Sequence, residues 1–166
     1  MAIILAFPVL IALIILQTVV VSRLPLLLGN ADLILLALTA WALQERVKDA
    51  WIWTIIGGIL VSLISAVPFY GLLIGYLAIT GIARILQRRV WQTPVLAMFV
   101  ATFLGTLITQ GLSFIFLIIK GVPIDLQEAL RLVTLPSLLL NLVLAFPIRA
   151  IMVDLAAWLY PVEIEL

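Results

Sequence analysis

The chain has 166 residues, of which 66% are hydrophobic and only 10% are charged, and its formal net charge is +1. A soluble domain is typically about half apolar and about a quarter charged, so this composition excludes an ordinary soluble domain and predicts an integral membrane protein. The near-neutral charge argues against nucleic acid as a partner. The absence of cysteine and histidine excludes thiol chemistry and the usual histidine-based catalytic and metal sites.

Long charge-free stretches divide the chain into membrane spans. A helix needs roughly 20 apolar residues to cross about 30 Å of hydrocarbon, and several stretches approach or exceed that length. We therefore predict an all-helical, polytopic transmembrane bundle of about six spans that forms a single domain over residues 1–166. The predicted spans are residues 2–22, 31–44, 51–67, 69–83, 94–119 and 132–155. The first is interpreted as a span and not as a cleavable signal, because no positive leading region and no small-residue cleavage site are present.

Residues 50–83 allow two interpretations. A single helix of that length would overshoot the bilayer, and Pro68 and Gly71 interrupt it, which favours two spans joined by a short turn. One tilted helix would instead give five spans and place the termini on opposite sides of the membrane. Further along, Asp125 and Glu128 have the spacing of a helix N-cap and its reciprocal partner, which predicts a short helix on the membrane surface.

The distribution of lysine and arginine predicts the orientation, because cytoplasmic loops are enriched in these residues. With six spans, the N-terminus and the C-terminus are both expected in the cytoplasm. The expected cytoplasmic cations are Arg46, Lys48, Arg84, Arg88, Arg89 and Arg149, against Arg23, Lys120 and Arg131 outside. Indole rings favour the membrane interfaces, so tryptophans near the span ends are expected there. They are Trp51, Trp53, Trp91 and Trp158.

Small residues recur at every fourth position of the fifth span, and a second pair has the same spacing in the fourth. Such spacing lets another helix approach closely. It predicts either packing within this bundle, which we favour, or a docking face for a partner's transmembrane helix. The residues are Ala97, Ala101, Gly105, Thr109 and Ser113, with Gly71 and Gly75 in the fourth span.

Polar side chains inside membrane spans are the other candidates for function. We single out Asp32, Gln110, Asn141 and Arg149; Gln17 also lies within a span. Thr102, Thr106, Thr109, Gln110 and Ser113 would form one polar strip on the fifth span, which could bind a ligand or, as we favour, hydrogen-bond neighbouring helices. Arg149 lies near a span end, where snorkelling to the interface explains it. No nucleotide-binding loop, nucleophile motif or acid–base pair is evident, so neither an enzyme nor a cofactor is expected.

Three stretches carry a family resemblance. Asn30-Ala-Asp-Leu-Ile-Leu-Leu36 opens the second span, residues 57–77 form the hairpin of the third and fourth spans, and Leu135-Pro-Ser-Leu-Leu-Leu-Asn141 with Ala145-Phe-Pro-Ile148 belongs to the last. Together with the length and the six-span layout, they resemble MreD, a family of small membrane proteins of the bacterial cell-elongation machinery.

The resemblance implies a non-catalytic scaffold in the bacterial cytoplasmic membrane. Such a scaffold would bind MreC, a bitopic protein with an extracytoplasmic domain. Through MreC it would work with RodA, a class B penicillin-binding transpeptidase and MreB in lateral peptidoglycan synthesis and rod shape. The family fold is similar to the S component of energy-coupling-factor vitamin transporters, which supplies the alternative function. Ala2 and Ala6 have the spacing of the docking motif in the first span of an S component.

Overall fold

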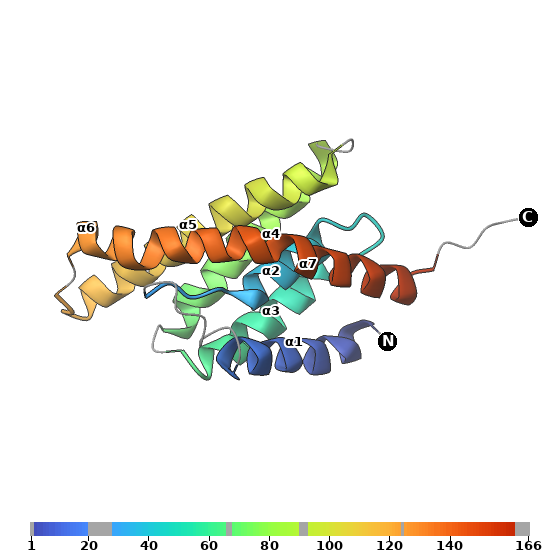
Figure 1. Cartoon of the computed structure of the whole chain (residues 1–166). Helices are drawn as coiled ribbons and strands as arrows, with labels where there is room; N and C mark the ends of the chain where they lie inside the picture. Colours follow the sequence, from blue (N-terminus) through green and yellow to red (C-terminus); the bar gives the residue numbers. More distant parts are fainter. Residues whose placement is uncertain (1, 20–27, 66–67, 90–92, 124, 162–166) are drawn as a thin grey trace, which may run out of the picture.

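A computed structural model of the chain describes residues 2–19, 28–65, 68–89, 93–123 and 125–161. Every regular element in these ranges is helical, which confirms the predicted fold class (Figure 1). The elements in chain order are α1 (Ala2–Val19), α2 (Leu33–Ala42), α3 (Ala50–Ser62), α4 (Phe69–Arg89), α5 (Pro94–Ile119), α6 (Leu126–Ala129), a π-helical turn η2 (Leu130–Thr134) and α7 (Leu135–Leu159).

In the part of the chain that the structure describes, four helical segments are long and apolar enough to cross a membrane, which makes the chain a multi-pass membrane protein. They are Ala2–Val19, Tyr70–Arg89, Pro94–Ile119 and Leu126–Leu159. The two remaining apolar helices are shorter, with 10 residues in α2 and 13 in α3. At 1.5 Å per residue, α2 is only about 15 Å long, which is half of the hydrocarbon thickness.

The short helix α2 forms the centre of the bundle. All ten of its residues are buried, and it contacts α1, α3, α4, α5 and α7. In Figure 1 it lies behind α7 and among the other helices, whose chain directions alternate. The N-terminal end of α1 and the C-terminal end of α7 consequently lie at the same end of the molecule, on the right of that view.

Helices α4 and α5 pack closely because small residues face larger ones across their antiparallel interface. A Cβ added at Gly75 would lie 3.1 Å from the Thr109 Cγ2 atom, and one added at Gly105 would lie 2.7 Å from the Ile79 Cγ1 atom. Gly71 faces the ring of Phe116 in the same way. The lack of a side chain at these glycines therefore allows the two helices to pack at a short distance.

The expected break in residues 50–83 occurs, because α3 ends at Ser62 and α4 begins at Phe69. The single tilted helix of the alternative interpretation is therefore wrong. The helix itself continues past the expected end of the fourth span at residue 83, since α4 ends at Arg89. Arginines in the last turn suit the negative end of the helix dipole, so the basic segment prolongs the helix.

The short helix expected after Asp125 forms, but it is continuous with the helix of the last span. The Asp125 carboxylate accepts hydrogen bonds from the backbone N–H groups of Gln127 and Glu128, at 2.8 and 3.3 Å, as expected for an N-cap. The helix then passes through the π-helical turn directly into α7. No residue between Asp125 and Leu132 breaks a helix, and the wider turn precedes Pro136, which lacks an N–H donor.

Candidate functional site

Residues 28–32 are a non-helical segment that runs along α7 into the bundle. Alternate backbone N–H groups of this segment bond to α7 and the turn before it. Leu28 N–H donates to the Leu132 carbonyl at 3.1 Å, Asn30 N–H to the Ser137 hydroxyl at 2.9 Å, and Asp32 N–H to the Asn141 side-chain carbonyl at 2.8 Å. Non-helical backbone is tolerated at membrane depth only when it is covered by protein and its polar groups are satisfied, and α7 provides both conditions.

Two residues allow this close approach. Pro136 has no N–H to bond to the carbonyl four residues earlier, so the Leu132 carbonyl is free to accept from Leu28. Gly29 lies directly against Pro136, and a Cβ added there would lie only 2.7 Å from the Ser137 backbone nitrogen. A larger residue than glycine would separate the segment from α7.

Asp32 joins this segment to α2 and α4. One carboxylate oxygen accepts from the Leu35 N–H at 2.9 Å and so caps the first turn of α2, while the other accepts from the Tyr76 hydroxyl at 2.9 Å. A carboxylate at this position satisfies an otherwise unpaired N–H group and interacts favourably with the positive end of the helix dipole. The remaining side-chain contact to the start of α2 comes from α1, where the Gln17 carbonyl accepts from the Leu33 N–H at 2.8 Å.

Asn141 extends the same network to α5. Its side-chain N–H donates to the Thr106 hydroxyl at 2.9 Å, and Thr106 in turn donates to the Thr102 carbonyl of its own helix at 2.8 Å. Asn141 and Thr106 are both almost fully buried. We call this network the α2 junction, and it joins α1, α2, α4, α5 and α7. Its members are Gln17, Asp32, Tyr76, Thr106, Ser137 and Asn141.

The structure thus brings together two of the four polar residues singled out in the sequence, Asp32 and Asn141. Gln110 lies one turn beyond Thr106 and is only partly buried, and its side chain forms no hydrogen bond with any described residue. Tyr76 and Ser137 were not among the predicted site residues, although each is a polar group within an apolar helix and could have been noticed on that ground.

The polar strip of α5 bonds mainly to its own helix. The Thr109 hydroxyl donates to the Gly105 carbonyl at 2.9 Å, and the Ser113 hydroxyl donates to the Thr109 carbonyl at 2.8 Å. Among the described residues, two buried hydroxyls lack a partner, those of Thr102 and Thr134. The strip therefore supplies one hydrogen bond to another helix, through Thr106, and its other described bonds are local.

The small-residue stripe of α5 lies inside the bundle. Ala97, Ala101 and Gly105 are buried, and Gly105 faces Ile79 of α4 and Leu35 of α2. The stripe is therefore used for internal packing at these three positions, and a docking face for a partner helix is wrong for them. The same correction applies to Gly71 and Gly75, which face α5 of the same chain. Thr109 and Ser113 are partly buried.

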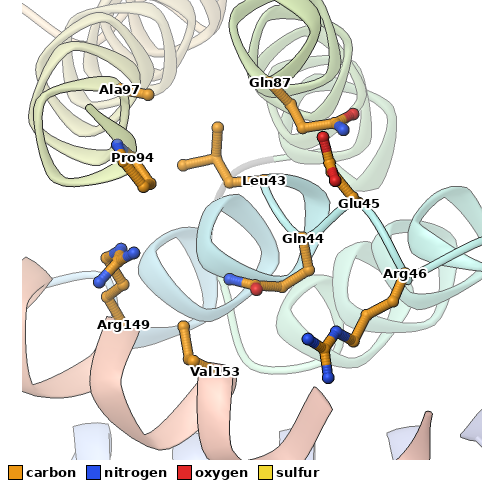
Figure 2. Close-up of a pocket in the computed structure, with 9 residues that line it drawn as sticks. All are labelled: Leu43, Gln44, Glu45, Arg46, Gln87, Pro94, Ala97, Arg149 and Val153. Atoms are coloured by element: carbon orange, nitrogen blue, oxygen red, sulfur yellow. The ribbon is translucent and has the colours of Figure 1, made fainter. Parts of the chain in front are cut away.

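A cavity of 290 Å³ opens at the end of the bundle where α1 begins and α7 ends. Figure 2 shows Arg149 and Val153 of α7 facing the residues that follow α2, with Gln87 of α4 and Pro94 of α5 across the opening. Arg149 thus belongs to this end of the molecule and not to the α2 junction. Its described lining residues are Leu43, Gln44, Glu45, Arg46, Gln87, Pro94, Ala97, Arg149 and Val153.

Asp49 organises the same end of the bundle through aromatic residues. Its two carboxylate oxygens accept from the indole N–H groups of Trp41 at 3.3 Å and Trp53 at 3.2 Å, and the two indoles stack with centroids 4.3 Å apart. Trp53 is fully buried and its N–H bonds to Asp49, so its ring packs against protein inside the bundle and does not face outward. Partial burial and the adjacent negative charge of Asp49 raise the pKa of Tyr160 to about 12.

The fold and the α2 junction define a multi-pass helical membrane protein in which polar side chains from five helices meet at the start of a short central helix. Within the described ranges, no group of three acidic, histidine or cysteine residues could hold a metal ion. Comparison with protein-family models, curated proteins and solved structures found no match.

Proposed function

We propose that the chain is a non-catalytic membrane scaffold of the MreD type. It would bind an MreC-type bitopic protein in the bacterial cytoplasmic membrane. Through that partner it would support RodA, a class B penicillin-binding transpeptidase and MreB in lateral peptidoglycan synthesis and rod shape. The proposal assigns its function to helix packing and short loops, since little of the chain lies outside the apolar helices.

One observation carries the proposal. The three stretches that resemble MreD are far apart in the sequence, yet each contributes a residue to the α2 junction. Asp32 belongs to the first, Tyr76 to the second and Asn141 to the third, and the hydrogen bonds of Asp32 connect all three. A chance resemblance in three short apolar stretches gives no reason for their polar residues to meet at one point, whereas a shared fold does.

The packed centre of the bundle supports a scaffold over a vitamin-binding S component. A vitamin would need a cavity among the spans with a few converging polar groups. Here the centre is filled by α2, whose ten residues are buried by apolar neighbours. Ala6 is also fully buried by this chain, so the Ala2–Ala6 pair does not present an open docking face. No observation favours the transporter function, and we do not propose it.

The partner-binding surface must then lie on residues that face outward. Helix α1 has only two buried residues, Ala6 and Leu10, and its exposed side includes Ile4 and Ile11. Helix α7 exposes Val143 and Phe146 over 72% and 62% of their surfaces. Lipid or a partner's transmembrane helix can cover both surfaces, so each of them must be tested.

Site-specific photocrosslinking in cells tests the proposal. A photoreactive phenylalanine analogue at Ile4, Ile11, Val143 or Phe146 should crosslink to an MreC-type protein from at least one helix. The same analogue at buried Leu38 is the matched control and should capture no partner. If all four outward positions give folded protein and none captures an MreC-type protein, the scaffold proposal is wrong.

The proposal also includes an orientation, with both termini in the cytoplasm. It rests on the common end of α1 and α7 and on the basic residues that line the two cavities there. A C-terminal green fluorescent protein fusion should fluoresce, and a C-terminal alkaline phosphatase fusion should be inactive. The opposite pair of results would reverse the orientation.

A further inference from the structure

A second cavity, of 460 Å³, lies beside the end of α4 at the basic end of the bundle. Three cations line it, Lys48 from the loop before α3 and Arg84 and Arg88 from α4, and none of the lining residues that the structure describes is acidic. The neighbouring Asp49 carboxylate is directed to the indoles of Trp41 and Trp53. The cavity therefore presents an excess of positive charge.

The three cationic side chains differ in their hydrogen bonds to the rest of the protein. The Arg84 guanidinium donates to the backbone carbonyls of Gln44, at 3.2 Å, and Val47, which hold it at the edge of the cavity. Lys48 and Arg88 are exposed, and their side chains form no hydrogen bond or ion pair with any described residue. Two cations are thus available to a ligand and a third is held beside them.

Apart from Gln87, the other described lining residues are apolar side chains or glycine, and two of them face outward. Ile85 is 58% exposed and Trp51 is 46% exposed, and both line the cavity next to the cations. Gly81 places no side chain on α4 beside Trp51, and a Cβ added there would lie in ordinary contact, 3.5 Å from the Trp51 Cη2 atom. Positive charge at the end of a span, with an exposed indole and an apolar surface beside it, matches the headgroup and the first acyl carbons of a lipid.

We propose that this cavity binds the phosphate of an anionic phospholipid, with Lys48 and Arg88 holding the phosphate and an acyl chain passing Ile85 and Trp51. A basic pocket between membrane helices is a known way of recognising acidic headgroups. Trp51 is then an interfacial residue, whereas Trp53, two positions later, is part of the core. The lipid site does not depend on the scaffold function, and either proposal can fail alone.

Native mass spectrometry of the purified full-length protein tests the site. Wild-type protein titrated with phosphatidylglycerol should bind it more tightly than phosphatidylcholine. Replacing both Lys48 and Arg88 with Gln should weaken phosphatidylglycerol binding by about 30-fold, at roughly 1 kcal/mol per cation, and leave phosphatidylcholine binding unchanged. Arg89→Gln is the matched control, because Arg89 is exposed beside Arg88 but does not line the cavity.

Three results would overturn the site. One is equal phosphatidylglycerol binding by the double variant and Arg89→Gln. Another is equal binding of the two lipids by wild type at low salt. The third is displacement of phosphatidylglycerol by millimolar inorganic phosphate, which would mean that the cavity recognises a free anion and not a lipid. If the double variant does not fold, the single Lys48→Gln and Arg88→Gln variants test the site, each with an expected loss of phosphatidylglycerol affinity of about 5-fold.

Gly81→Leu tests the apolar part of the cavity. It fills this part without changing the charge and should also reduce phosphatidylglycerol binding.

Discussion

Asn141 and Asp32 lie 109 positions apart in the chain and are joined by a 2.8 Å hydrogen bond in which the Asp32 backbone N–H donates to the Asn141 side-chain carbonyl. The side-chain N–H group of the same Asn141 amide donates to the Thr106 hydroxyl. One side chain on α7 thus connects the start of the central helix to α5.

Replacing Asn141 with Leu should destabilise the protein by about 1–3 kcal/mol, because it leaves the partly buried Asp32 N–H and the buried Thr106 hydroxyl each short of a partner. Thermal unfolding in detergent, followed by circular dichroism, measures the change. Gln110→Leu is the matched control, since the Gln110 amide has no hydrogen bond to any described residue and should be close to neutral. Equal melting temperatures for the two variants would contradict the importance of the junction.

At Asp32, substitution by Asn should be tolerated far better than substitution by Leu. Asn keeps an oxygen that can cap the Leu35 N–H, and its amide can still bond to the Tyr76 hydroxyl, whereas Leu removes both interactions. We expect a loss of about 1 kcal/mol or less for Asn and of about 2 kcal/mol or more for Leu. Unfolding in a denaturing detergent titration compares the two variants. If Asn is as damaging as Leu, the charge of Asp32 has a role beyond these hydrogen bonds.

The two glycines of α5 should respond in opposite ways to alanine. At Gly105 the added methyl group would meet Ile79 at 2.7 Å, and such overpacking typically costs about 1–3 kcal/mol. At Gly111 nothing lies within 4 Å, so alanine should stabilise the helix by about 0.5–1 kcal/mol. Melting temperatures of the two variants measure this directly. A fall at Gly111 together with no change at Gly105 would show that α4 and α5 do not pack as described.

Ionisation of Tyr160 should occur near pH 12 in the folded protein, because partial burial and the Asp49 charge favour the neutral phenol. A raised pKa means that this contribution to stability is complete below about pH 10, the ordinary value, and is lost as pH rises towards 12. The chemical shift of a 13C label at the Tyr160 Cζ atom follows the titration. Asp49→Asn should move the pKa of Tyr160 towards 10, and an unchanged pKa in that variant would exclude Asp49 as a cause.

The sequence predicted the helical segments and the candidate polar residues better than it predicted their surroundings. Absent charges mark the spans and Pro68 marks the hairpin, because lipid excludes charge and proline interrupts a helix. Hydropathy does not distinguish a leucine that faces lipid from one that faces protein, so the complete burial of α2 could not be inferred. Asp32 and Asn141 were recognised by their polarity, but which polar groups pair depends on how the helices are arranged.

The central position of α2 has a consequence for the order in which the protein assembles. During synthesis α2 is made after Gln17 of α1 but before its other two partners, since Tyr76 follows Asp32 by 44 residues and Asn141 follows it by 109. A helix of about 15 Å cannot span the bilayer alone, and its capping carboxylate lacks the Tyr76 hydroxyl at that stage. The hydrogen bonds of α2 are therefore completed only when the last helix has been inserted, and α7 closes the fold.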